Sequence, residues 1–149
     1  MLFKYHVITG LELQISQLEQ LKYPLVNKFY DQFRVKGRAK GHDDVWVGYL
    51  GYQLIAACRI QHVAEHLFLS TLFVDPAYQG LGYGRRIIQA IQSSYQTNIY
   101  LFAHPDLSPF YASVGFAAVN TLPDELTKML KIYQKHNLSL ASFLSTYSH

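Results

Sequence analysis

A glycine-rich segment near the middle of the chain has the residue types needed to bind an anion. The segment is Gln79-Gly-Leu-Gly-Tyr-Gly-Arg85, which follows an apolar run at residues 67–74 and precedes a helix-like stretch at residues 85–92. Glycines allow positive φ and let a ligand come close to the main chain. Amide N–H groups at the start of a helix can then converge on one anion. The order strand, glycine turn and helix therefore predicts a phosphate-binding loop.

The spacing of the glycines excludes two common phosphate loops. A P-loop needs Lys and then Ser or Thr after its glycines, whereas Arg85 and Arg86 follow Gly84. A dinucleotide-binding turn needs G-x-G-x-x-G and an acidic residue about 20 positions further on. Here the glycine spacing differs, and Asn98 and Tyr100 stand where that acid is sought. The segment fits Q/R-x-x-G-x-G/A instead.

In this form the loop resembles the acyl-coenzyme A loop of the GNAT superfamily of N-acetyltransferases. It is preceded by Leu72-Phe-Val-Asp-Pro76, as in that superfamily. A second segment, Phe110-Tyr-Ala-Ser-Val-Gly-Phe116, resembles the F-Y-x-x-x-G-F segment of the same enzymes. The two motifs in this order are specific in combination, and the resemblance spans nearly the whole chain. A Pro-led helix at residues 122–135 further resembles a group of short members that place a helix between the last two strands.

The resemblance implies an α/β (α+β) fold, the GNAT fold. It is a mixed, twisted sheet of about six to seven strands with a central splayed parallel pair, flanked by about four helices. The whole chain, residues 1–149, is expected to form one domain. Hydrophobic periodicity predicts helices at residues 11–35 (bent near Pro24), 84–95 and 122–135, with one or two helical turns after Asp106. The strands are predicted at residues 3–8, 45–50, 54–60, 67–74, 99–103, 116–119 and 138–144.

Composition and charge exclude several other classes of protein. Half of the residues are hydrophobic and 15% are charged, so the chain is globular. No apolar run reaches membrane-spanning length, and residues 1–8 are too short and interrupted for a signal peptide. The single Cys58 cannot form an internal disulfide, which favours the cytoplasm, and we interpret it as a buried, inert thiol. The basic run at residues 34–40 is interpreted as a solvated loop, not as a nucleic-acid site. The seven histidines have no metal-ligand spacing, so no metal is expected.

The resemblance also assigns a site for acetyl-CoA. The pantetheine arm is expected to bond to the main chain of Leu72, Phe73 and Val74 like an added strand. Arg85 is expected to add a charge-assisted contact to the pyrophosphate. His104 stands where many members have an asparagine that contacts the coenzyme and caps the next helix, with Asp106 or Ser108 as alternative caps. The remaining expected coenzyme contacts are Gln79, Gly80, Leu81, Gly82, Tyr83, Gly84, Phe110 and Tyr111.

The implied reaction is N-acetylation of a primary amine by direct attack in a ternary complex. Tyr111 matches the family's general acid, since a phenol with a pKa of about 10 is protonated at neutral pH. The Val74 N–H matches the donor to the oxyanion. The sequence does not identify the general base. His66 is a candidate, as are Glu65 and His62. A base that acts through water, or no dedicated base, is also open.

The acceptor cannot be named from the sequence, because its expected region, residues 11–44 and 119–144, has no diagnostic charge pattern. Homodimers are common in the family and are not determined by the sequence. The alternative function is a non-catalytic acyl-CoA-binding or regulatory domain. It is favoured by Phe68, which stands where some relatives have a glutamate in the strand before the loop.

Overall fold

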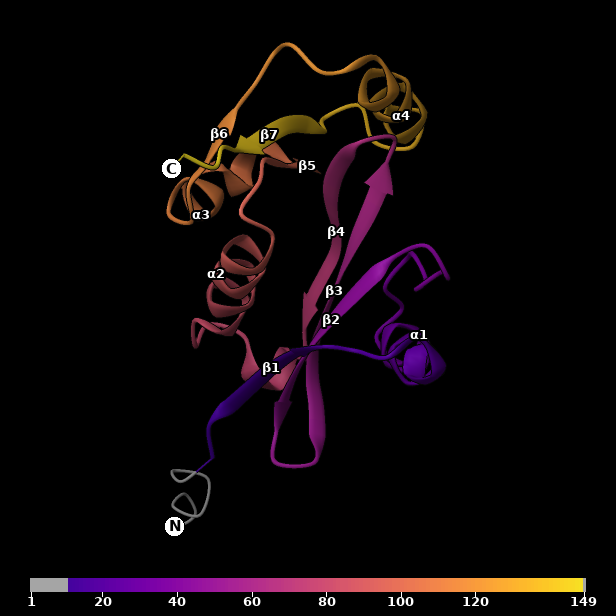
Figure 1. Ribbon diagram of the computed structural model, residues 1–149, viewed down its shortest axis with the longest axis vertical. Helices are drawn as coiled ribbons and strands as arrows, with labels where there is room; N and C mark the ends of the chain where they lie inside the picture. Colours follow the sequence, from indigo (N-terminus) through magenta and orange to yellow (C-terminus); the bar gives the residue numbers. More distant parts are fainter. Residues whose placement is uncertain (1–10, 149) are drawn as a thin grey trace. The chain divides into compact units, whose positions relative to one another are not determined.

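The computed structural model describes residues 11–148, so the strand predicted at residues 3–8 lies outside the described part (Figure 1). Four α-helices are found in this part: α1 (Tyr23–Gln32), α2 (Tyr83–Tyr95), α3 (Ser108–Ala112) and α4 (Asp124–Gln134). The strands are β1 (Leu13–Gln17), β2 (Asp44–Leu50), β3 (Gln53–Val63), β4 (His66–Val74), β5 (Ile99–Ala103), β6 (Phe116–Ala118) and β7 (Ala141–Ser145). Short 3-10 turns precede α1, α2 and α3.

These strands form one seven-stranded sheet in the order β1-β2-β3-β4-β5-β7-β6. β1 pairs antiparallel with β2, and β5 and β6 each pair antiparallel with β7. β4 and β5 are parallel, with Leu67 opposite Ile99 and Phe68 opposite Tyr100. The predicted mixed sheet with a central parallel pair is therefore confirmed.

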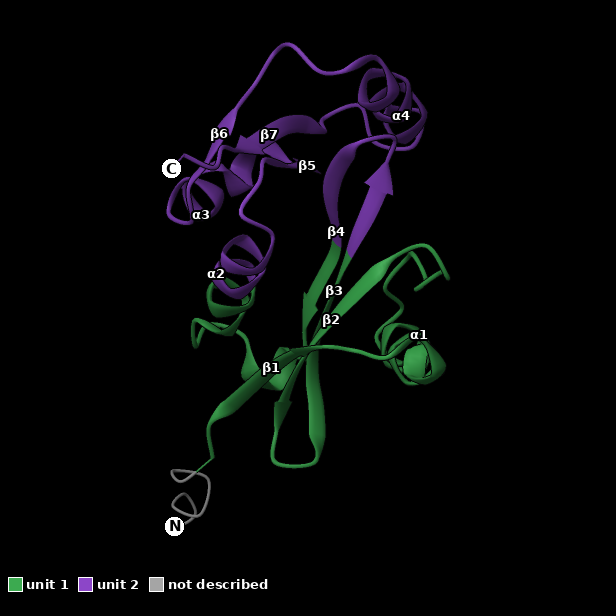
Figure 2. Cartoon of the chain, viewed as in Figure 1, with its two compact units in different colours: residues 1–59, 71–87 green, residues 60–70, 88–149 purple. Residues whose placement is uncertain are grey.

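The chain divides into two compact units, coloured separately in Figure 2. Unit 1 comprises residues 1–59 and 71–87, of which residues 11–59 and 71–87 are described, and unit 2 comprises residues 60–70 and 88–149, described to residue 148. The strands β3 and β4 and the helix α2 each contribute residues to both units. The two units are described separately below.

In unit 1, helix α1 buries one face against β2 and β3. Val26 and Tyr30 are fully buried in a cluster that also contains Val45, Val47 and Ala57. These positions on α1 lie four residues apart, which puts them on one face of a helix. Burial of this apolar stripe fixes α1 on its strands.

In unit 2, aromatic rings join α4 to β4 and β5. The Tyr133 ring lies edge-on to the rings of Phe68 and Phe102, with centroids 6.2 and 5.6 Å away. The Gln92 side chain of α2 donates through Nε2 to the Val114 carbonyl at 2.7 Å and to the Ser145 hydroxyl at 3.0 Å. One amide group therefore ties α2 to the segment before β6 and to β7.

The helix predicted at residues 11–35 is wrong in its first half. This stretch forms strand β1, then a 3-10 turn, and only then helix α1. The residues Leu11, Leu13 and Ile15 fit a helical spacing in part, but they also alternate with polar residues, which is the period of a strand. Pairing with β2, with Leu13 opposite Leu50, decides between the two. Pro24 therefore lies in the first turn of α1 and does not bend a longer helix.

The other predicted elements in the described part are confirmed, with boundary shifts of a few residues. The last strand begins at Ala141, later than predicted, because residues 138–140 lie in a turn. In that turn the Ser139 N–H donates to the Asn137 side chain at 3.1 Å. Asparagine commonly makes this local bond, which competes with strand pairing. In the described part, no helix is long and apolar enough to cross a bilayer.

We expect Gln92→Leu to destabilise the protein by about 1–3 kcal/mol, because the Val114 carbonyl loses its donor. Urea denaturation followed by circular dichroism measures this change. Gln89→Leu is the matched control, since Gln89 is an exposed glutamine on the same helix. Equal stability of the two variants would show that the hydrogen bonds of Gln92 do not stabilise the fold.

Candidate functional site

The predicted phosphate loop starts at the end of β4 and is tied back to that strand. The Asp75 N–H donates to the Ile55 carbonyl at 2.7 Å. The Asp75 carboxylate accepts from the Ala77 N–H at 2.9 Å and so caps the 3-10 turn Pro76–Tyr78. Gln79 then donates through Nε2 to the Val74 carbonyl at 2.7 Å. These bonds fix where the chain leaves the strand.

Two of the three glycines adopt backbone angles that other residues avoid. Gly80 has φ of 80° and Gly82 has φ of 85°. A Cβ built at either position meets no atom within 4 Å, so the space beside both glycines is open. Gly84 instead lies in the first turn of α2. The loop therefore uses Gly80 and Gly82 for their conformation, and it leaves room for a ligand to approach the main chain.

The charges at the start of α2 are the reverse of what an isolated helix prefers. Its first turn contains no acidic residue, and Arg85 and Arg86, both exposed, are close to the N-terminus. Cations are unfavourable there because the helix dipole is positive at that end. An anion bound at this terminus would make both arginines favourable. The positive charge at the start of α2 and the open space beside Gly80 and Gly82 thus both favour an anion at this loop.

The strand before the loop is held by helix α1. The Phe73 ring lies 6.0 Å from the Phe29 ring and 5.4 Å from the Phe33 ring. Leu72, Phe73 and Val74 are all partly exposed at the end of β4. Within unit 1, the proposed pantetheine strand and the glycine loop are thus consecutive in the chain and anchored by α1.

Sequence reasoning missed a buried polar group behind this strand. Arg59 and Asp43 form an ion pair of 2.9 Å with both side chains 7% exposed. Arg59 also donates to the Thr71 hydroxyl at 3.0 Å, and the Tyr30 hydroxyl donates to the Thr71 carbonyl at 2.8 Å. Burial raises the pKa of Tyr30, so this phenol is neutral and acts as a donor. The sequence signal was a charged residue, Arg59, inside an apolar strand.

Cys58, next to Arg59, is fully buried, which confirms the predicted structural thiol. Burial raises its pKa to about 12, so the reactive thiolate is absent at neutral pH. Among residues 11–148, no group of three or more histidine, cysteine or acidic side chains could hold a metal ion.

Unit 2 contains the proposed acid, Tyr111, on helix α3. Its ring lies 5.9 Å from the Phe116 ring and 5.8 Å from the Phe143 ring. The Phe110 ring, 5.1 Å away, packs edge-on against it. Gly115, with φ of 88°, ends this segment and turns the chain into β6. The F-Y-x-x-x-G-F motif therefore builds an aromatic support that fixes the position of the tyrosine ring.

His104 itself takes the capping role that was left open between Asp106 and Ser108. Its Nδ1 accepts from the Asp106 N–H at 3.1 Å at the start of the turn Pro105–Leu107. An asparagine side chain would make the same kind of bond. The Ser108 hydroxyl instead donates to the Pro105 carbonyl at 2.6 Å.

His66 and Val74 stand at the two ends of β4. His66 begins this nine-residue strand, and its ring lies 6.0 Å from the Tyr100 ring. Val74 ends the strand. Glu65 lies in the turn between β3 and β4, and His62 lies near the end of β3. In the chain, all three candidate bases therefore stand at or before the start of β4, whereas the glycine loop follows its end.

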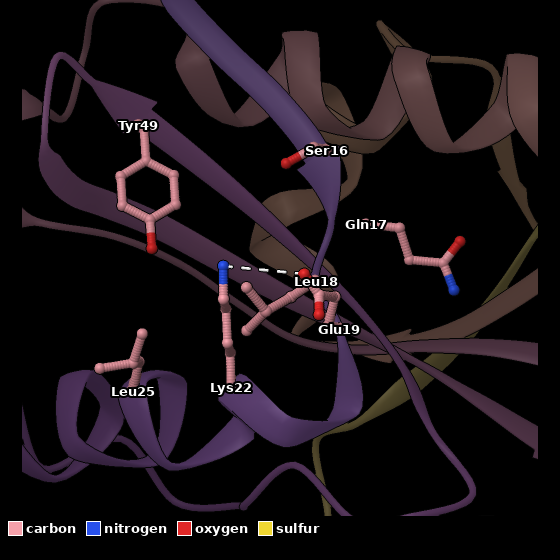
Figure 3. Close-up of a pocket in the computed structure, with 7 residues that line it drawn as sticks. All are labelled: Ser16, Gln17, Leu18, Glu19, Lys22, Leu25 and Tyr49. Atoms are coloured by element: carbon pink, nitrogen blue, oxygen red, sulfur yellow. Dashed lines mark ion pairs between the residues drawn. The ribbon is translucent and has the colours of Figure 1, made fainter.

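Two hollows on unit 1 are lined in part by residues of the predicted acceptor region. The first, of about 290 Å³, lies between β1, β2 and the start of α1, and Lys22 pairs there with Glu19 at 3.7 Å (Figure 3). The second, of about 280 Å³, shares Leu25 and Tyr49 with the first. Its other lining residues are Lys28, Phe29, Gln32, Tyr52 and Leu54. Because Phe29 also contacts Phe73, the second hollow lies beside the helix residues that pack on β4.

The sequence matches the family described as "Acetyltransferase (GNAT) domain" over residues 41–118, more than half of the chain. This range contains β4, the glycine loop and α3. The chain belongs to the GNAT acetyltransferase family. A comparison with curated proteins gives no significant match.

Several solved structures have the same fold at low identity. The ribosomal-protein-S18-alanine N-acetyltransferase from Escherichia coli is 15% identical, with a TM-score of 0.65, over 93% of this chain and 96% of its own. A putative streptothricin acetyltransferase from Bacillus anthracis, solved with acetyl coenzyme A, is 17% identical with a TM-score of 0.62, over 92% and 98%. The N-acetylglutamate synthase from Neisseria gonorrhoeae, solved with coenzyme A and N-acetyl-glutamate, is 15% identical with a TM-score of 0.71, over 93% of this chain but 36% of its own.

For this GNAT protein we expect Gly82→Ala to lower stability by about 1–2 kcal/mol, because a Cβ strains a left-handed backbone. Gly82→Asn should cost less, since asparagine tolerates this conformation best among the other residues. Thermal unfolding of both variants measures the difference. If alanine and asparagine cost the same, backbone strain is not what requires glycine here.

Proposed function

We propose that this protein is an acyl-CoA-dependent N-acetyltransferase that moves an acetyl group from acetyl-CoA to a primary amine. The observation that carries the proposal is the loop between β4 and α2, where two glycines with positive φ leave open space beside the main chain. Family membership supports the same reaction class. Two similar structures contain coenzyme A or acetyl coenzyme A, which supports the choice of donor.

The residues of unit 1 fit the donor. Amides of Gln79, Gly80, Leu81, Gly82, Tyr83 and Gly84 would hold the pyrophosphate. Arg85, in the first turn of α2, would add a charge-assisted contact to the pyrophosphate. The main chain of Leu72, Phe73 and Val74 would bond to the pantetheine arm. The bound thioester supplies an activated acetyl group, and no metal is required for its transfer.

Val74 and Tyr111 would divide the chemistry between them. The Val74 N–H would stabilise the charge that develops on the carbonyl oxygen as the amine nitrogen attacks the carbonyl carbon. The Tyr111 hydroxyl would donate its proton to the sulfur as the carbon–sulfur bond breaks. Phe110 and His104 would be further coenzyme contacts, and His104 also caps the turn that leads into α3. Attack is direct, so no covalent enzyme intermediate forms.

The amine must also lose a proton, and we assign this step to water. A general base must come within hydrogen-bond reach of the proton that it removes. His66, the first residue of β4, is the alternative base. Phe68, at the position where some relatives have a glutamate, is buried and packed on Phe102.

The acceptor would enter the hollows beside α1, as a small amine or a peptide N-terminus. The names of two similar structures mention an amino acid: one is an N-acetyltransferase of ribosomal-protein-S18-alanine, and the other is an N-acetylglutamate synthase. We propose a cytoplasmic protein with no nucleic-acid or membrane partner, which could form a homodimer. In the basic run, Arg38 already pairs with Asp31 at 3.0 Å, which supports the solvated-loop interpretation.

The alternative is a domain that binds acyl-CoA without turnover. The observation in its favour is the buried Phe68, because no titratable group occupies that position. Binding without release of thiol from a broad set of amines would favour this alternative.

We expect calorimetric titration with acetyl-CoA to show saturable binding at one site. Gly82→Trp should abolish it, because the large side chain would fill the open space beside the loop. Leu138→Trp is a control, since Leu138 is 86% exposed and lies outside the loop. If wild-type protein shows no heat of binding, or Gly82→Trp still binds, the loop is not a coenzyme site.

We expect Tyr111→Phe to lower kcat by about a hundredfold, with little change in the KM for acetyl-CoA, because the acid acts only as the thiolate leaves. A thiol-release assay with polyamines, amino acids, aminoglycosides and peptide N-termini finds an acceptor and then measures both constants. Tyr147→Phe, a tyrosine variant near the C-terminus, serves as the control. Unchanged turnover in Tyr111→Phe would remove Tyr111 from this role.

A further inference from the structure

Thr71 has a backbone conformation that is rare inside a strand. Its φ is 56°, in the left-handed region, although it is β-branched and lies within β4. The other non-glycine residues with positive φ in the described chain, Arg34, Ala64 and Gln96, lie outside strands and helices. Such a conformation costs free energy at a β-branched residue and persists only where the surroundings impose it.

Two side chains bond to Thr71. The Tyr30 hydroxyl donates to its carbonyl at 2.8 Å, and Arg59 Nη1 donates to its side-chain hydroxyl at 3.0 Å. Gly37 leaves the space that this arrangement needs. A Cβ at that position would lie 3.1 Å from Arg59 Nη1 and 3.2 Å from the Thr71 hydroxyl oxygen. Backbone and side chain of Thr71 are therefore held from different directions.

The arginine is itself oriented by a buried carboxylate. Arg59 Nε donates to Asp43 Oδ2 at 2.9 Å, and the same oxygen accepts from the Lys40 N–H at 2.9 Å. Both charged side chains are 7% exposed. Burying an ion pair is costly, and apolar residues of similar volume often give equal stability. Stability alone therefore explains this pair poorly, and a positional role explains it better.

We propose that Tyr30, Arg59 and Asp43 are positioning residues that set the coenzyme-binding end of β4 by holding Thr71 in its left-handed conformation. The inference rests on the proposed function. A left-handed residue interrupts the alternation of a strand, so it rotates the N–H and C=O groups that follow. Those that follow at once are Leu72, Phe73 and Val74, the groups proposed to bond to the pantetheine arm and the oxyanion. We call Tyr30, Arg59 and Asp43 the Thr71 clamp.

The test compares two tyrosines of the same helix. Tyr30→Phe removes the hydroxyl that bonds to Thr71, whereas Tyr23→Phe removes a hydroxyl that donates to the Asp43 carbonyl at 2.7 Å. Both side chains are buried in one cluster, so both variants should lose similar stability in urea. We expect the Kd for acetyl-CoA, measured by calorimetry, to rise about tenfold in Tyr30→Phe only, the effect of losing one well-placed interaction.

Two further measurements separate positioning from general weakening. In Tyr30→Phe without coenzyme, the amide NMR signals of residues 72–74 should shift, and in Tyr23→Phe they should not. Thr71→Gly should restore affinity to Tyr30→Phe in the double variant, because glycine adopts positive φ without a clamp. Equal Kd and equal spectra for Tyr30→Phe and Tyr23→Phe would overturn the clamp alone. No binding by wild-type protein would overturn the coenzyme site, and with it the role proposed for the clamp.

Discussion

The parallel pairing of β4 with β5 is the constraint on which the proposed site depends. Parallel neighbours cannot be joined by a tight turn, so the chain must leave the carboxyl end of β4 and return through a crossover, here α2. That requirement puts a loop and a helix N-terminus immediately after the last residues of the strand. Exposed strand groups, glycine amides and the helix dipole therefore follow one another within a short stretch of chain.

The two units position their proposed site residues by different kinds of interaction. In unit 1, α1 covers the strands with an apolar face, and the polar Thr71 clamp lies within the same packing. The buried charges of Arg59 and Asp43 are tolerated because their polar atoms are hydrogen-bonded. Among the described residues, no buried side-chain nitrogen or oxygen lacks a hydrogen-bond partner. In unit 2, aromatic rings replace the polar clamp, and Tyr111 is positioned by Phe116 and Phe143.

The elements with strong local signals were predictable, and the ambiguous ones were not. The glycine loop, α2 and β5 were predicted at nearly the observed residues, because turn chemistry and periodicity agree there. The stretch that forms β1 has an apolar pattern that fits both a strand and part of a helix, so only its pairing with β2 could decide. The cap before α3 was assigned to Asp106 or Ser108, whereas His104 makes that bond, because a histidine nitrogen can accept from the backbone as an asparagine oxygen does.

The sequence alone determined the family and the positions of the glycine loop and of the tyrosine after β5, because these depend on residues close together in the chain whose chemistry is local. Tertiary structure decided what surrounds them. Asp43, Arg59 and Thr71 are distant in sequence, and their hydrogen bonds exist only once β3, β4 and the loop before β2 are packed. The loop from Gln79 to Arg85 is therefore recognisable from its composition, whereas the conformation of the strand that leads into it is a property of the folded chain.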